Sequence, residues 1–468
     1  MMKLTDSRGL AVSSRNTAAL ERFELAALLT HGYFGNPLAV IDEALTEEPD
    51  FALGHCLKAD LAVMSSERAA LPMLRESVEA VERLGSRATD RERAHIAAAR
   101  AWLEGDFARA VRLYGDIVLE YPHDLLALQT AHVGDFYLGE SSMLRDRISH
   151  VLPHWGPQVP GFGFVLGMYA FGLEETAHYA RAEDAGRRAL DLNSRDPWAV
   201  HAVAHVMEMQ GRLRDGIDWL ESTAANWSAD CAFAYHNWWH LALYHLDLGD
   251  ADRAIDLYDC AVHPGPTQVA LELVDASALL WRLALRGYDV GERWQQLAEC
   301  WSQTSEGGFY AFNDVHALMA FASCRRSGDV ARLLTILERR AADRDTNGVM
   351  CRDVALPLAR AIEAMSRGAD AEAVEHLLEV RTRAHRFGGS YAQRDLVHLT
   401  LVEAALRTGD VRRARALASE RTEFKPTSPF NWSLTARALS ALGDEQAAAA
   451  AGEHAELRFK AQLRRVAA

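Results

Sequence analysis

Four times in the C-terminal half of this 468-residue chain, an Asp stands before an apolar run at nearly constant spacing. The four residues are Asp275, Asp314, Asp353 and Asp395, and successive members are 39, 39 and 42 residues apart. A period between about 20 and 50 residues is typical of solenoids, in which each repeat buries its apolar face only against its neighbours. The spacing therefore predicts one continuous repeat core, although the chain length alone would suggest about three domains.

A second series of turn signals indicates the kind of repeat. A Gly, usually followed by Asp, precedes a helical pattern of Ala and Leu at Gly105, Gly211, Gly249, Gly328, Gly368, Gly409 and Gly443. Residues 105–122 show a turn Gly, a small Ala110 and a closing Pro, as expected for the second helix of a tetratricopeptide-type hairpin. Strand signals are almost absent. We therefore predict an all-α fold, an α-solenoid of tetratricopeptide-type helical hairpins forming one superhelix with no sheet.

The domain organisation follows from the repeats. Residues 1–17 are polar and carry no repeat signal, so we expect a loose N-terminal segment there. We expect residues 18–468 to form a single superhelical domain, because a solenoid adds units to one core.

Composition bears on partners and location. The net charge is −15 without a long run of one sign, which argues against nucleic acid or a membrane surface as the main partner. The first residues contain no apolar core of secretory length, so we expect no signal peptide, and no apolar run reaches membrane-spanning length. The six cysteines are far apart and form no Cys-x-x-Cys pair, as expected for reduced residues. We predict a cytoplasmic protein with no nucleic-acid partner and no membrane partner.

The most informative polar pattern is on one expected helix before Gly211. His201, His205 and Glu208 lie within an arc of about 60° on such a helix. Their distances from the turn Gly are those at which tetratricopeptide hairpins face their groove. Imidazoles beside a carboxylate suit general acid–base chemistry near neutral pH.

The next hairpin supplies a second pair, His236 and His240, again four residues apart. We take His201, His205, Glu208, His236 and His240 as the candidate catalytic residues. Further candidates for binding a ligand in the same groove are His95, His316, Trp239, Phe171 and Glu174.

Three interpretations of the histidines remain open. They could form a hydrogen-bonded packing seam, or a ligand-binding or catalytic pocket without metal. Alternatively, the four residues His201, His205, His236 and His240 could hold a divalent metal, since two His at i, i+4 are a metal-ligand spacing.

The Asp series also has two interpretations. We expect each Asp to cap the helix that follows it, because its carboxylate accepts hydrogen bonds from unpaired N–H groups. Arg352 and Arg394 directly precede Asp353 and Asp395. They could build an Arg–Asp ladder between repeats, or bind a carboxylate or phosphate ligand.

Five segments together resemble the tetratricopeptide repeat protein 38 family. They are residues 196–208, 235–244, 312–320, 352–358 and 389–395. The resemblance extends from about Asn36 to Pro429. It implies a soluble, cytoplasmic helical-repeat protein and leaves the biochemical activity open.

Two hypotheses of function follow. The first is a binding module that holds a small organic ligand or a peptide in a groove lined by His and Trp. The second is an enzyme, either a hydrolase, a lyase or a metal-dependent oxidoreductase, that uses the His/Glu cluster as acid, base or ligand set. The sequence leaves the cofactor open, with a divalent metal as one possibility, and it also leaves the oligomeric state open.

Overall fold

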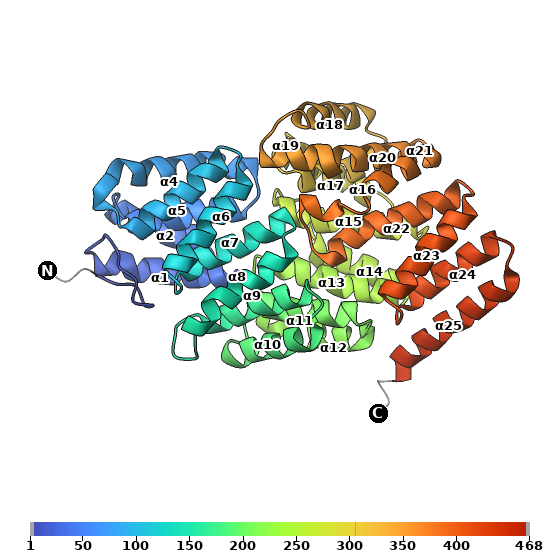
Figure 1. Ribbon diagram of the computed structural model, residues 1–468, viewed down its shortest axis with the longest axis horizontal. Helices are drawn as coiled ribbons and strands as arrows, with labels where there is room; N and C mark the ends of the chain where they lie inside the picture. Colours follow the sequence, from blue (N-terminus) through green and yellow to red (C-terminus); the bar gives the residue numbers. More distant parts are fainter. Residues whose placement is uncertain (1–3, 305, 465–468) are drawn as a thin grey trace. The chain divides into compact units, whose positions relative to one another are not determined.

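The computed structural model describes residues 4–304 and 306–464, which fold into α-helices joined by short turns (Figure 1). Within these residues no strand forms, and only isolated bridges pair Thr5 with Ala11 and Phe34 with Cys231. The predicted all-α solenoid of helical hairpins without a sheet is confirmed. None of the described helices is both long enough and apolar enough to cross a membrane.

Contacts divide the chain into two compact units, here called unit 1 and unit 2. Unit 1 comprises Met1–Val203, Ala225–Ala234 and Arg344–Asn347. Unit 2 comprises Ala204–Ala224, Tyr235–Asp343 and Gly348–Ala468.

In unit 1, helices that follow one another along the chain pack together, as α9 does with α10 and α5 with α6. The helices are α1 (Thr17–Gly32), α2 (Pro37–Glu47), α3 (Ala52–Met64), α4 (Leu71–Leu84), α5 (Asp90–Leu103), α6 (Phe107–Glu120), α7 (Leu125–Leu138), α8 (Ser141–Val151), α9 (Phe162–Glu174) and α10 (Tyr179–Leu192). Short 3₁₀ turns lie at Arg68–Ala70, Gly85–Arg87 and Leu152–His154. Helices α11 (Pro197–Met209), α12 (Leu213–Trp227), α13 (Ala234–Asp247) and α19 (Thr346–Met350) contribute residues to both units.

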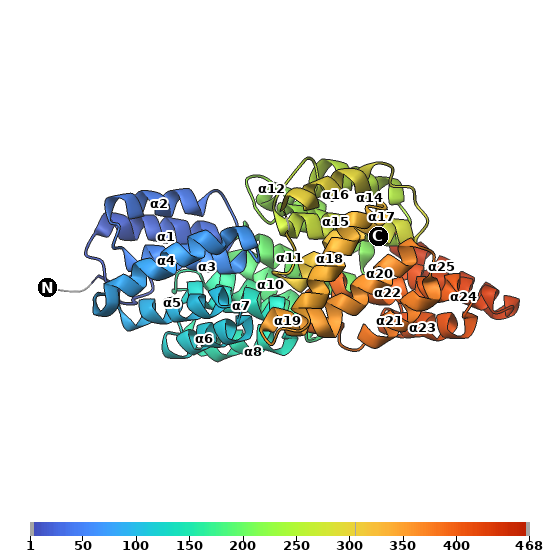
Figure 2. The ribbon, with the colours of Figure 1, turned by 90° about the horizontal axis from the view of Figure 1, so that it is seen from above.

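Unit 2 continues the same hairpin pattern (Figure 2). Its helices are α13 (Ala234–Asp247), α14 (Ala251–Leu257), α15 (Ala270–Leu285), α16 (Arg293–Thr304), α17 (Ala311–Ser323), α18 (Ser327–Arg340), α19 (Thr346–Met350), α20 (Leu356–Ser366), α21 (Asp370–Val380), α22 (Tyr391–Arg407), α23 (Val411–Phe424), α24 (Pro429–Ala441) and α25 (Glu445–Arg464). Helix α14 is extended by a π-turn at Tyr258–Val262. A second π-turn, Cys351–Ala355, precedes α20, and a 3₁₀ turn lies at Ala384–Phe387.

The turn glycines explain how the hairpins begin. Gly105 has φ +86° and is followed by Asp106, whose carboxylate accepts a hydrogen bond from the backbone N–H of Arg109 and caps α6. A left-handed residue followed by an N-cap reverses the chain between two helices. Gly328 departs from the prediction, because it lies inside α18 and the turn before that helix is made by Arg325, with φ +56°.

The Asp series was predicted wrongly as a set of helix caps. Asp275, Asp314 and Asp395 lie inside α15, α17 and α22, and Asp353 lies in the second π-turn. The residues that precede the three helices are Val269, Tyr310 and Ser390. These three carboxylates lie about one turn inside their helices. They therefore bond to groups outside the first turn and do not cap the helix.

The N-terminal segment also differs from expectation. From residue 4 onward it is held on unit 1, because Asp6 forms a buried ion pair with Arg91 at 3.2 Å. Ser14 Oγ donates to Glu48 Oε2 at 2.7 Å. The segment is therefore anchored by polar contacts over its described part, and residues 1–3 lie outside the described residues.

The first and last elements of unit 2 meet. Gln462 Nε2, on α25, donates to the carbonyl of Gly211 at 2.7 Å. Thr427 Oγ1, before α24, donates to the carbonyl of Gln210 at 3.0 Å. These contacts close unit 2 on itself at the end of α11, next to the candidate site.

Candidate functional site

Three histidines of unit 2 come together between the end of α11 and α13. His205, His236 and His240 each offer a ring nitrogen, and these atoms lie within 4.8 Å of one another. The ring of His240 is 4.4 Å from that of His205 and 4.8 Å from that of His236, measured between centroids. His236 and His240 share a face of α13 because they are four residues apart. The two predicted His pairs thus contribute three rings to one cluster within unit 2.

The cluster is buried and does not line an open groove. His205 and His240 are completely inaccessible to solvent, and His236 is 8% exposed. The cluster therefore offers almost no exposed surface to an extended chain.

Two of the histidines are oriented by carboxylates. His236 Nδ1 lies 2.6 Å from Asp275 Oδ2, and His240 Nδ1 lies 3.2 Å from Glu208 Oε2. An ionised carboxylate only accepts hydrogen bonds, so each Nδ1 carries the proton and donates it. In the neutral ring, Nε2 then holds the lone pair. This is the arrangement by which proteins orient histidine ligands of metal ions.

A lysine far away in the sequence fixes the charge of Glu208. Lys425 Nζ donates to Glu208 Oε1 at 3.0 Å, and both side chains are buried. Burial raises the pKa of Glu208, but Lys425 and the hydrogen bond from His240 more than offset this and hold the pKa well below its usual range. Glu208 is therefore an ionised acceptor, which makes it a poor general acid.

The electrostatics keep His240 neutral. Burial lowers the pKa of His240 well below 6.5, and the neighbouring His205 lowers it further, against the opposing effect of Glu208. A neutral imidazole is the form that binds a metal ion.

Trp239 forms one wall of the cluster. Its ring stacks on His236 with centroids 5.4 Å apart and meets His240 edge-on at 4.9 Å. Its indole Nε1–H is buried and has no hydrogen-bond partner among the described residues. A buried donor of this kind is suited to an acceptor on a bound ligand or water.

His95 does not take part in this cluster. It is fully buried in unit 1, where Nδ1 lies 2.7 Å from Asp60 and Nε2 lies 2.9 Å from Asp124. Burial lowers its pKa, but the two carboxylates raise it overall to about 10. The predicted ligand-binding role of His95 is therefore wrong, because both ring nitrogens are occupied by an internal ion network that also includes Arg91.

Three other predicted residues belong to an aromatic layer in unit 1 or to its edge. The ring of His201 lies 5.2 Å from Phe171 and 5.2 Å from Trp198. Phe171 is completely buried, and Glu174 is 1% exposed at the end of α9. His201 precedes His205 by about one turn of α11, as the spacing predicts.

His316 lies in α17 with its Nδ1 2.8 Å from the carbonyl oxygen of Phe312. Burial is the main cause that lowers its pKa to about 4, so the ring is neutral at pH 7. Its local backbone hydrogen bond explains its place in the helix without a ligand.

The predicted Arg–Asp ladder forms with different arginines. Asp395 is bound by Arg421 at 2.7 Å and by Arg282 at 3.1 Å. Arg352 is exposed and lies 3.5 Å from Asp353, while Arg394 donates to the carbonyl of Gly389 and lies over the ring of Tyr391. The ion pair of Arg352 with the adjacent Asp353 is therefore exposed, whereas Asp395 takes its arginine partners from other helices.

Sequence reasoning missed the partners of the histidines. Asp275 was recognised as part of the repeat series but not as the partner of His236, although it follows His236 by one repeat of 39 residues. Lys425 has no signal in the sequence, since its contact with Glu208 spans 217 residues. Gln393, whose Nε2 lies 3.5 Å from Asp275 Oδ1, was equally without a signal.

Comparison with known proteins adds distant matches. No family model matches the chain. A structure of a human IFIT1 dimer with PPP-AAAA matches 96% of this chain and 95% of that chain, at 12% identity and a TM-score of 0.40. A human IFIT1 dimer with m7Gppp-AAAA matches 94% and 95%, at 14% identity and a TM-score of 0.35. The P58(IPK) TPR domain matches 81% and 97%, at 14% identity and a TM-score of 0.22.

These matches correct one prediction. We predicted from the acidic net charge that the protein has no nucleic-acid partner, yet the human IFIT1 structures contain RNA. The exclusion of a nucleic-acid partner is therefore withdrawn. At these TM-scores the likeness says nothing about which ligand this chain binds.

Proposed function

We propose that this protein is a helical-repeat, metal-binding protein whose centre in unit 2 is formed by His205, His236 and His240. The observation that carries the proposal is the pair of carboxylate–imidazole hydrogen bonds from Asp275 and Glu208. They orient two of three imidazoles whose ring nitrogens lie within 4.8 Å of one another. A set of three imidazole nitrogen ligands suits Zn²⁺ or another divalent transition metal, and does not suit Ca²⁺ or Mg²⁺, which prefer oxygen.

A small organic ligand is the partner that best fits this centre. Three protein ligands leave a coordination position open, and the buried Nε1–H of Trp239 offers a donor beside it. The burial of the cluster disfavours the peptide that the sequence also allowed. A catalytic or metal-binding role for His201 remains a prediction from the sequence.

An enzyme is the second candidate, and the open position favours it. A water molecule bound to such a metal is a nucleophile near neutral pH, which is consistent with a hydrolase or a lyase. The ionised, lysine-bound Glu208 would then orient His240 and would not itself transfer the proton.

Two finer assignments from the sequence are also proposals. Membership of the tetratricopeptide repeat protein 38 family rests on the five motif segments, without support from a family model. A cytoplasmic location is consistent with the free state of all six cysteines.

Metal titration of the purified chain, after treatment with a chelator, tests the proposal. We expect one equivalent of Zn²⁺ or Co²⁺ to bind, with no saturable binding of Ca²⁺ or Mg²⁺. His240→Ala should abolish the binding. Asp275→Asn, which removes only an orienting group, should weaken it by about 10–100-fold.

The matched control is His245→Ala, a half-buried histidine on the same helix α13 that pairs with Asp250. It should bind metal like the wild type. Circular dichroism of each variant checks the fold. Less than one equivalent of bound metal in the wild type, or equal binding by a folded His240→Ala, would refute the metal centre.

A further inference from the structure

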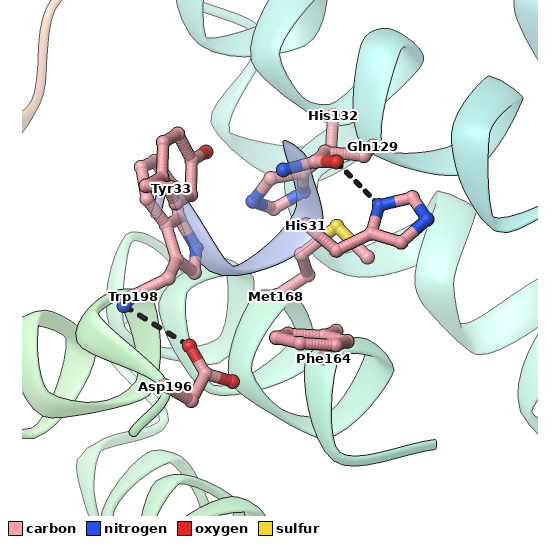
Figure 3. A pocket seen from close by; sticks show the side chains of 8 residues that line it. All are labelled: His31, Tyr33, Gln129, His132, Phe164, Met168, Asp196 and Trp198. Carbon is pink, nitrogen blue, oxygen red and sulfur yellow. Dashed lines mark hydrogen bonds between the residues drawn. The ribbon is translucent and has the colours of Figure 1, made fainter. Parts of the chain in front are cut away.

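Unit 1 contains a small polar cavity that is separate in its residues from the histidine cluster of unit 2. It lies among α1, α7, α9 and the start of α11, and it is shown in Figure 3. Its lining consists of His31, Tyr33, Gln129, His132, Phe164, Met168, Asp196 and Trp198. The cavity volume is about 10 Å³, which is room for about one water-sized guest.

Asp196 contributes a carboxylate that is only half engaged. Its Oδ1 accepts hydrogen bonds at 3.0 Å from the backbone N–H groups of Trp198 and Ala199, and so caps α11. Its Oδ2 is buried and has no hydrogen-bond partner among the described residues. A Cβ at Gly167 would lie 2.9 Å from Oδ2, so the missing side chain at Gly167 leaves this oxygen its space.

His31 contributes a second acceptor. Its Nδ1 lies 2.7 Å from Gln129 Oε1, while the amide nitrogen of Gln129 faces the carbonyl of Thr30 at 3.4 Å. With this assignment Nδ1 donates, and Nε2 carries a lone pair that has no hydrogen-bond partner among the described residues. Burial is the main cause that lowers the pKa of His31 to about 3, so the ring is neutral at pH 7.

The lining contains no Lys or Arg. Burial raises the pKa of Asp196 to about 7, and only its two backbone hydrogen bonds oppose this rise. Aromatic faces complete the lining, since His31 lies 5.7 Å from Phe164 and Tyr33 lies 5.9 Å from Trp198. The site therefore combines one uncompensated acid with aromatic rings, which is the chemistry that recognises a cation.

A divalent metal fits this cavity poorly. The ligand atoms of His31, His132 and Asp196 do not gather within 4.8 Å of one another, as those of the histidine cluster in unit 2 do. The unpaired Oδ2 of Asp196 instead suits a guest that brings its own N–H donors and is about as large as water.

We propose that this cavity binds one ammonium-type cation, either the ammonium ion or the –NH₃⁺ head of a short primary amine. Asp196 Oδ2 is its counter-ion. A neutral water molecule could fill the same space, but it would leave the carboxylate without a counter-charge.

Calorimetric titration of the full chain at pH 8 and constant ionic strength tests this site. The probes are ammonium and methylammonium chloride, with sodium, potassium and tetramethylammonium chloride as comparators. Saturable binding of ammonium is expected, with none for sodium or tetramethylammonium. Binding of methylammonium as well identifies an amine head group as the guest, and binding of ammonium alone identifies the free ion.

Asp196→Asn keeps the cap of α11 and the shape of the side chain but removes the charge, so ammonium binding should fall by at least about tenfold. The matched control is Asp106→Asn, which alters an exposed cap in the same unit and should bind like the wild type. If titration of the wild type with ammonium gives no saturable heat of binding, the cavity holds only an ordered water and the proposal is overturned. Equal binding of potassium, or unchanged binding in a folded Asp196→Asn, also overturns it.

Discussion

Replacing His95 by Gln should make the stability of the protein less dependent on pH. Folding raises the pKa of His95 from 6.5 to about 10, because the two carboxylates outweigh the effect of burial. The protonated ring therefore contributes its full stabilisation below pH 6.5 and loses it as the pH rises through 10. Each pKa unit corresponds to about 1.4 kcal/mol, so the contribution is at most about 5 kcal/mol.

The assay is the melting temperature by calorimetry at several pH values from 6 to 10, for the wild type and for His95→Gln. His95→Gln should melt lower at pH 6, because it leaves Asp60 and Asp124 buried without the imidazolium. The difference should shrink between pH 6.5 and 10. About 2–4 °C corresponds to 1 kcal/mol in a domain of roughly this size, so the change is measurable.

The control is His178→Gln, which alters an exposed histidine of the same unit and should follow the wild type at every pH. A direct check is the titration of the His95 ring by NMR. A ring that titrates at or below pH 6.5 would refute the reasoning. A constant melting difference across the range would contradict it equally.

Two further predictions concern packing and the buried ion pair. Gly172→Ala should destabilise the protein by about 1–3 kcal/mol in thermal melts, because the new Cβ would lie 2.4 Å from the backbone of Leu144. The control is Gly452→Ala in α25, where the new Cβ meets nothing within 4 Å and should stabilise the protein slightly. Lys425→Met should lower the free energy of unfolding by about 3–5 kcal/mol in chemical denaturation, because it leaves Glu208 buried without its ion-pair partner. Adding Glu208→Gln should restore most of this loss. No recovery in the double variant would contradict the ion pair.

The sequence was informative wherever the structure is local. The left-handed turn at Gly105 and the cap at Asp106 follow from neighbouring residues, and so does the shared face of His236 and His240. The predicted turn at Gly328 was wrong because the turn before α18 uses Arg325, a residue type that rarely adopts positive φ.

The candidate site was predictable only in part. The histidines showed helical spacing, but the contact of Lys425 with Glu208 depends on how small rotations add up over many hairpins. Spacing also gave no means of distinguishing His95, which is enclosed by Asp60 and Asp124, from histidines that lack such partners. Burial and the choice of partner are properties of the folded chain, and no single helix encodes them.

The closure of unit 2 restricts how such a gene can change. In an open solenoid, an insertion or deletion of one hairpin disturbs only its two neighbours, and array length drifts readily. Here Gln462 reaches Gly211 and Lys425 reaches Glu208 across 251 and 217 residues. One extra hairpin between α15 and α23 would carry Lys425 away and leave a buried carboxylate without its counter-charge. Selection should therefore hold the number of hairpins in unit 2 constant and confine length variation to its loops.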